Sequence, residues 1–187
     1  MSNYLSVATV TATLRQIVLQ ALQAVPKVSG DVQVRTGKPE NPSPGFVGAN
    51  LYLYRIMPNN ALRHKEPIPK RAAGILRKGP VTALDLYYVL SFYGDEKQQE
   101  PERFLGSAIM ALHRQPTLTA ELIRQTVANA AAGSYLAESD LQNQSELVRF
   151  SLQTLSADEL ARTWGLFARV AYAPSVFYKG SAVVLAG

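Results

Sequence analysis

The sequence Val81-Thr-Ala-Leu-Asp-Leu-Tyr-Tyr-Val-Leu-Ser-Phe-Tyr93 decides the fold of this chain. It is rich in β-favouring residues and contains no glycine or proline. Its alternation places on one face of an extended chain Leu84, Leu86, Tyr88, Leu90 and Phe92, and on the other Ala83, Asp85, Tyr87 and Val89. Because the strand is long and largely apolar on both faces, we predict that it lies at the centre of a sheet.

Shorter periodic segments surround this strand. Apolar residues at spacings of three and four predict a helix over Tyr4 to Val25 that ends before Pro26. Further helices are predicted from Glu102 to Gln115, from Thr119 to the helix-ending Gly133, and from the capping pair Ser156 and Glu159 through Phe167. Further strands are predicted over Asp31 to Arg35, Ala49 to Met57 and Glu146 to Leu155, and Ala173 to Ala186 is either a closing strand or a hairpin turning at Lys179 and Gly180.

The order of these elements favours one fold class. Since only some of the strands are separated by helices, a doubly wound parallel sheet is disfavoured. We expect a single α+β domain over residues 1–187, with a mixed or mainly antiparallel sheet flanked by helices.

The net charge of +5 is concentrated in one segment. Between Arg55 and Lys78, seven basic residues stand against a single acid, Glu66, and prolines and glycines interrupt the run, so we predict an exposed basic loop at about residues 58–80. The loop is either a solvated connection or a contact for an acidic surface. The candidate partner-binding residues are Arg63, Lys65, Lys70, Arg71, Arg77 and Lys78. Nucleic acid is the less favoured partner, because no aromatic residue in this segment offers a base a stacking surface.

Residues that usually carry catalysis or bind cofactors are scarce. The chain has no cysteine, its two histidines lack metal-binding spacing, and neither a phosphate-binding loop nor a G-x-G-x-x-G pattern occurs. Asp85 could act in catalysis from its apolar strand, but a strand aspartate is more commonly paired with a neighbouring arginine or a backbone amide. Two tyrosine pairs are interpreted as sheet packing rather than a ligand cage: Tyr52 with Tyr54, and Tyr87 with Tyr88. We expect no enzyme, metal, cofactor or small-molecule substrate.

The chain also lacks the signals of a membrane or secreted protein. No apolar run approaches the roughly 18 residues of a membrane span, and the N-terminus lacks the pattern of a signal peptide. We therefore expect the protein to be made and assembled in the cytoplasm.

Several stretches occur in a characteristic order and spacing: Met1-Ser-Asn-Tyr-Leu-Ser-Val-Ala-Thr-Val-Thr-Ala-Thr-Leu14, Asn50-Leu-Tyr-Leu-Tyr-Arg-Ile-Met-Pro-Asn-Asn60, Ala83-Leu-Asp-Leu-Tyr-Tyr-Val-Leu-Ser-Phe-Tyr-Gly94, Leu105 through Leu112-His-Arg-Gln-Pro116, Glu146-Leu-Val-Arg-Phe150 and Ser156-Ala-Asp-Glu-Leu160. Taken together they resemble the cap, or tail-terminator, proteins of extracellular contractile injection systems, which are phage-tail-like particles. The resemblance extends over nearly the whole chain.

This resemblance implies a structural function. It implies a homo-oligomeric ring, expected to be a hexamer, that sits on the inner tube and sheath at the end distal to the baseplate and stops their polymerisation. The expected partners are tube and sheath proteins, in a particle that is either released or membrane-anchored. The alternative function is a small nucleic-acid-binding protein that uses the basic loop. A further hypothesis is that the strand Ala182 to Ala186 pairs across a subunit boundary, the alternative being an internal edge strand.

Overall fold

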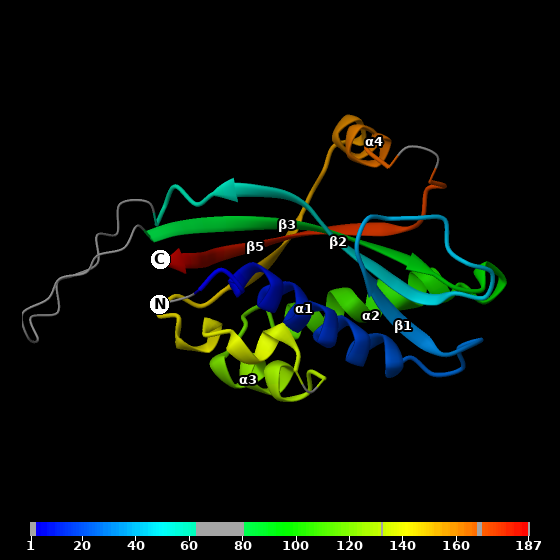
Figure 1. Ribbon diagram of the computed structural model, residues 1–187. Coiled ribbons are helices and arrows are strands. Elements are labelled where there is room, and N and C mark those ends of the chain that lie inside the picture. Colours follow the sequence, from blue (N-terminus) through cyan, green and yellow to red (C-terminus); the bar gives the residue numbers. More distant parts are fainter. Residues whose placement is uncertain (1–2, 63–80, 132, 168–169, 187) are drawn as a thin grey trace, which may run out of the picture.

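The computed structural model describes residues 3–62, 81–131, 133–167 and 170–186, and within them five strands form one sheet in the order β1-β2-β3-β5-β4 (Figure 1). The strands are β1 (Val32–Thr36), β2 (Val47–Pro58), β3 (Val81–Tyr93), β4 (Arg149–Gln153) and β5 (Ser175–Ala186). β1 and β2 run parallel, and the other neighbouring strands run antiparallel. The predicted α+β fold with a mixed sheet is therefore confirmed.

β3 lies in the middle of the sheet, as predicted, and one of its faces forms the floor of the main core. Its fully buried side chains on this face are Leu86, Tyr88, Leu90 and Phe92. Three helices cover the face: α1 (Ser6–Gln23), α2 (Glu100–Arg114) and α3 (Ala120–Ala128) (Figure 1). The apolar stripe predicted for the first helix explains its position, because Val10, Leu14 and Val18 on α1 are fully buried in the same cluster.

The opposite face of the sheet carries one helix, α4 (Ala157–Gly165) (Figure 1). The predicted capping box is confirmed: Ser156 Oγ accepts the N–H of Glu159, and the Glu159 carboxylate accepts the N–H of Ser156. A small cluster beneath α4 contains the buried residues Val89, Phe167 and Phe177. The sheet thus has one face covered by three helices and one covered only in part.

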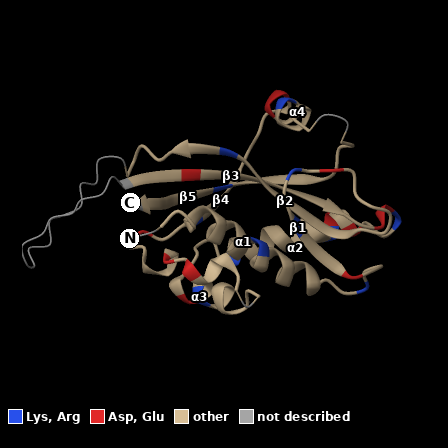
Figure 2. Cartoon of the chain, viewed as in Figure 1, with Lys and Arg blue, Asp and Glu red and all other residues tan. Residues whose placement is uncertain are grey.

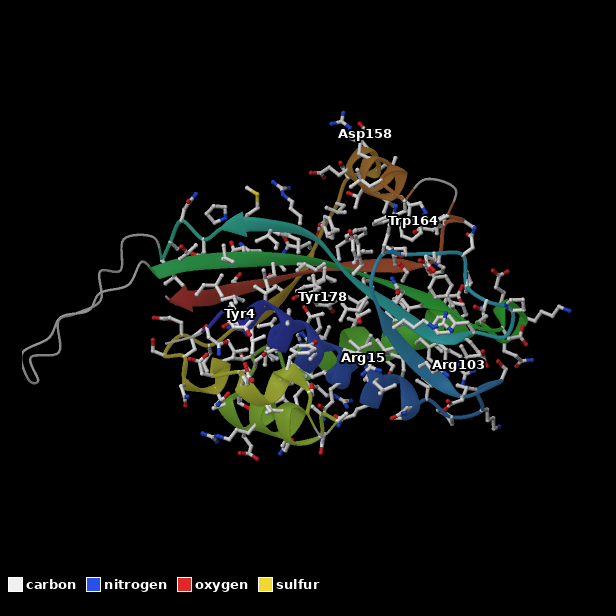
Figure 3. The ribbon with its side chains drawn as sticks, in the orientation of Figure 1. Tyr4, Arg15, Arg103, Asp158, Trp164 and Tyr178 are labelled. Carbon is white, nitrogen blue, oxygen red and sulfur yellow. The ribbon has the colours of Figure 1, made fainter. Side chains whose placement is uncertain are left out.

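A fully buried carboxylate holds the start of α2 against the turn that follows α1. Glu100 is 0% exposed, and it accepts hydrogen bonds from the N–H and hydroxyl of Ser29, at 2.5 and 2.8 Å, and from the N–H of Asp95, at 2.8 Å. Burial alone would raise the pKa of Glu100, but these hydrogen bonds outweigh it and hold the pKa below its ordinary value. Arg103, one turn further along α2, donates to the carbonyls of Pro26 and Lys27 in the same turn (Figure 3).

The C-terminal segment is one strand, so the hairpin alternative at Lys179 and Gly180 is wrong. β5 continues through both residues and lies between β3 and β4. Gly180 does not form a turn. Its lack of a side chain leaves room for the Phe150 ring on β4, because a Cβ at this position would lie 2.8 Å from Cε1 of Phe150. Beyond it the pairing with β3 shifts register, and Ala182 takes a left-handed φ of 69°.

Other predicted boundaries move by a few residues. β4 is shorter than the strand predicted over Glu146 to Leu155, and α3 ends at Ala128, before the alanine run. β2 starts two residues before the predicted Ala49, so Gly48 is part of the sheet. Short 3₁₀ helices complete the described chain: η1 (Glu96–Gln98), η2 (Tyr135–Glu138) and η3 (Leu141–Asn143).

Candidate functional site

The candidate partner-binding residues of the basic loop lie outside the described residues. This holds for Arg63, Lys65, Lys70, Arg71, Arg77 and Lys78. The flanking structure shows where their segment leaves the fold. Pro58 at the end of β2 pairs with Leu84 near the start of β3, so the chain enters and leaves the segment at one end of the sheet.

Asp85 is held in an ion pair. Its carboxylate lies 2.7 Å from Nζ of Lys179 on β5 and accepts a hydrogen bond of 2.7 Å from Nδ2 of Asn59. The hydrogen bond to Asp85 raises the pKa of Lys179, which keeps the lysine charged. The prediction that this aspartate is paired is confirmed, although its partner is a lysine rather than an arginine, on a neighbouring strand that is far away in the sequence. Within the described residues no group of acidic and histidine side chains could hold a metal ion.

The tyrosines of β2 and β3 pack within the sheet, as predicted. Tyr54 and Tyr52 make edge-on contacts with Phe177 and Phe167, at centroid distances of 5.7 and 5.6 Å. Tyr88 points to the helical face, where its hydroxyl lies 2.9 Å from Oγ1 of Thr11 on α1, and burial raises its pKa above the ordinary value. These side chains lie on both faces of the sheet and do not form a cage.

A groove runs between α1 and β1, with a volume of about 1080 Å³. Its helical wall is lined by small and apolar side chains, including Val7, Ala8 and Ala12, and its other wall is β1 from Val32 to Thr36. The side chain of Arg15 on α1 extends across the groove, and its Nε–H donates a hydrogen bond of 2.7 Å to the carbonyl of Val34 (Figure 3). A groove of this form offers a surface for another chain rather than an enclosed pocket for a small molecule.

Short contacts from within the chain cover parts of two other sheet edges, at the start of β4 and at the end of β5. Along β4, the Phe150 N–H donates to the Pro116 carbonyl, and the Leu118 N–H donates to the Val148 carbonyl. Along the end of β5 that extends past β4, the side-chain amide of Gln144 takes the place of a strand. The amide donates to the Ala182 carbonyl at 2.7 Å, and it accepts the Val184 N–H at 2.9 Å.

The hypothesis that Ala182 to Ala186 pairs across a subunit boundary meets an obstacle in this arrangement. On one side, Val183 and Val184 pair with β3, at Leu84 and Ala83. On the other side, Gln144 already occupies the Ala182 carbonyl and the Val184 N–H that a neighbouring strand would need. The internal alternative is the one that the structure shows at these residues.

The comparisons with known proteins give the family. The family model described as the Pvc16 N-terminal domain matches residues 9–187. The chain belongs to the Pvc16 N-terminal domain family. No curated protein sequence matches the chain at a significant level.

Two solved structures share the fold of this Pvc16 N-terminal domain. One is the sheath/tube terminator, in the extended state, of the extracellular contractile injection system PVC: it is 14% identical, with a TM-score of 0.57, and covers 94% of this chain and 56% of its own. The other is the tube-terminating cap of the anti-feeding prophage, AFP, which is also 14% identical with a TM-score of 0.57 and covers 93% and 54%. The resemblance to cap proteins is thus confirmed at the level of family and fold, while this chain spans about half the length of those proteins.

Within the described residues no helix is both long enough and apolar enough to cross a membrane.

Proposed function

We propose that this chain is a structural cap of a contractile injection system and that it ends the inner tube and sheath at the end distal to the baseplate. The observation that carries the proposal is the family match over residues 9–187, together with a shared fold with two proteins described as terminators. In this proposal the protein has no enzymatic activity. Neither the family match nor the structural neighbours favour the alternative of a nucleic-acid-binding protein.

The asymmetry of the domain supports such a function. A tube grows because each ring presents a surface that the next ring can bind, so a terminator must bind on one side and offer no equivalent surface on the other. In this domain one sheet face is buried under α1, α2 and α3, and the other is only partly covered by α4 (Figure 1). Intramolecular contacts also cover the start of β4 and the end of β5. The two faces of the sheet therefore offer different surfaces to neighbouring proteins.

The assembly that we propose is a homo-oligomeric ring, with six subunits expected from the family resemblance. Its partners are the tube and sheath proteins of the particle. Assembly takes place in the cytoplasm, and the finished particle is either released or anchored.

Deletion of this protein tests the proposal directly. We expect particles of uncontrolled length, or failed assembly, because nothing would then stop tube and sheath growth. Electron microscopy of purified particles measures the length distribution. Re-expression of the intact chain should restore a narrow distribution, and unchanged particles after deletion would contradict a cap function.

Charge reversal in the basic loop tests the candidate partner-binding residues. In the variant Lys70→Glu, Arg71→Glu, Arg77→Glu and Lys78→Glu, we expect the amount of this protein on particles to fall about tenfold or more, since complementary charges govern encounter and register. Quantitative mass spectrometry of purified particles gives this amount. The matched control reverses four exposed cations elsewhere, Lys27, Lys38, Lys97 and Arg114. Equal retention of both variants would remove the loop from the interface.

A further inference from the structure

The part of the sheet face not covered by α4 carries a charged surface on which two arginines, Arg55 and Arg149, have no acidic partner among the described residues. In Figure 1 no helix lies over the end of the sheet formed by the second half of β2, the start of β3 and the end of β5. We call this surface the open sheet face and define it by Arg55, Tyr87, Lys179, Ser151 and Arg149. Figure 2 shows blue segments on β2 and β5 in this region and a red segment on β3.

Strand register places these residues in one row. Arg55 on β2 pairs with Tyr87 on β3, Tyr87 pairs with Lys179 on β5, and Lys179 pairs with Ser151 on β4. Arg149 lies two residues before Ser151 and therefore points to the same face. The row crosses four of the five strands, so its outer residues, Arg55 and Ser151, are separated by three strand spacings, about 14 Å.

The charge of this row is only partly balanced. Asp85 is the acid of this part of the sheet, and its carboxylate is already bonded to Lys179 and Asn59. Arg55 and Arg149 are exposed, and neither forms an ion pair with an acidic side chain in the part of the chain that the structure describes. The face therefore presents two unpaired guanidinium groups around one neutralised lysine. Beside Asp85, Met57 is 37% exposed and adds apolar surface.

The aromatic residue of the row is not available to stack on a base. The Arg55 guanidinium carbon lies 5.4 Å from the centre of the Tyr87 ring, and Nζ of Lys179 lies 5.9 Å from the same centre. These cation–π contacts use the ring that single-stranded nucleic acid would need for stacking. Two guanidinium groups separated by a neutral centre instead match two carboxylates held at a similar separation.

We propose that the open sheet face binds an acidic segment of a neighbouring protein in the particle, with one carboxylate on Arg55 and another on Arg149. Arg149 lies two residues, about 7 Å, along β4 from Ser151 at the end of the row, so its backbone is about 16 Å from that of Arg55. Because an extended chain advances about 3.3 Å per residue, the two acidic residues would lie about four or five positions apart in an extended segment. The identity of the partner as a particle component rests on the proposed function, while the acidic chemistry rests on the open sheet face alone.

A pair of matched variants tests this interface in the particle. Arg55→Glu/Arg149→Glu reverses the two unpaired charges, and Lys38→Glu/Lys97→Glu makes the same charge change on exposed residues away from the face. We expect the first variant to reduce the amount of this protein on purified particles about tenfold, and the control to reduce it less than about twofold. The variant Arg55→Lys/Arg149→Lys keeps the charge and should retain most of the binding. Circular dichroism and thermal unfolding establish that all three variants fold.

A second measurement needs no particle. Fluorescence anisotropy follows binding of a fluorescein-labelled oligoglutamate peptide to the isolated chain at low salt, and the charge-reversed variant should bind several-fold more weakly than the control. Both variants keep residues 63–80 unchanged, so any peptide binding by the cations of that segment is the same in both variants. A labelled DNA duplex is run in parallel, and stronger loss of DNA than of peptide binding would overturn the proposal in favour of nucleic acid.

The two measurements separate the inference from the proposed function. If the wild-type chain is absent from particles, the cap function fails, and the peptide comparison still decides the chemistry of the face. If the wild-type chain ends the particles but the charge-reversed and control variants behave alike in both measurements, the docking inference is wrong and the cap function stands.

Discussion

Gly48→Ala is expected to cost about 4 kcal/mol of unfolding free energy, through backbone strain and steric clash together. Gly48 has a φ of +133°, which side-chain-bearing residues rarely adopt, and its partner in the parallel pairing of β1 with β2 is Gln33. A Cβ added at this position would lie 1.9 Å from the Gln33 carbonyl oxygen. Since that atom belongs to the backbone, β1 must move as a whole, and it would take the buried Val32 and Val34 with it.

Urea unfolding followed by circular dichroism measures this loss. The control is Gly106→Ala, because a Cβ at Gly106 meets nothing within 4 Å and the residue lies inside α2. Helix propensity should make that control more stable by about 0.5–1 kcal/mol. Similar stabilities for the two alanine variants would show that β1 does not pack against β2 as described.

Glu100→Ala is expected to destabilise the protein by about 3 kcal/mol at neutral pH, because it leaves buried donors without an acceptor. The N–H groups of Ser29 and Asp95 both lose their partner, and the link between α2 and the turn after α1 is lost. The control is Glu102→Ala in the same helical turn, where the side chain is exposed and the change should stay within about 0.5 kcal/mol. A Glu100→Ala variant as stable as this control would contradict a buried, hydrogen-bonded carboxylate.

The pH dependence gives a second, independent test of Glu100. Its pKa in the folded state is lowered, so its stabilising effect is complete above the unfolded-state pKa of about 4.3 and is lost as the pH falls through the lower folded-state value. Urea unfolding of the wild type and of Glu100→Ala between neutral and acidic pH should therefore show two curves that converge in acid. A constant difference across this range would mean that the carboxylate charge contributes nothing.

The central strand and the first helix were predictable because local periodicity decides them. Leu86, Tyr88 and Leu90 on β3 alternate with residues of the other face, and the stripe on α1 repeats with the helical period. In both elements the pattern within the segment itself identifies the buried face, without knowledge of which element packs against it. The same is true of the capping box at Ser156, whose donors and acceptors lie within one turn.

The pairing of strands was less predictable, because it depends on residues far apart in the chain. β1 and β2 are parallel although the connection between them contains no helix, and parallel neighbours are usually joined by one. Gly180 looked like a turn residue, whereas its lack of a side chain makes room for the Phe150 ring. The anchor Glu100 has no local signature that distinguishes it from Glu96 or Glu102 in the same acidic stretch.

Only one part of the charged surface was predictable from the sequence. A run of cations between Arg55 and Lys78 is visible in one dimension, but all six of its candidate partner-binding residues lie outside the described structure. Arg55, Lys179 and Arg149 come from β2, β5 and β4, and only the strand register brings them into one row. A surface assembled in this way leaves no regular spacing in the sequence, so it could not be predicted from the sequence.

The amide of Gln144 has a consequence for the free subunit before any assembly begins. The strand that it covers ends in the apolar residues Val183, Val184 and Leu185, and an exposed edge of this composition is a template for edge-to-edge aggregation. With one side-chain amide bonded to both, the Ala182 carbonyl and the Val184 N–H are not available for a second copy to start a shared sheet. We therefore expect Gln144 to protect newly made copies from aggregating with one another through this edge.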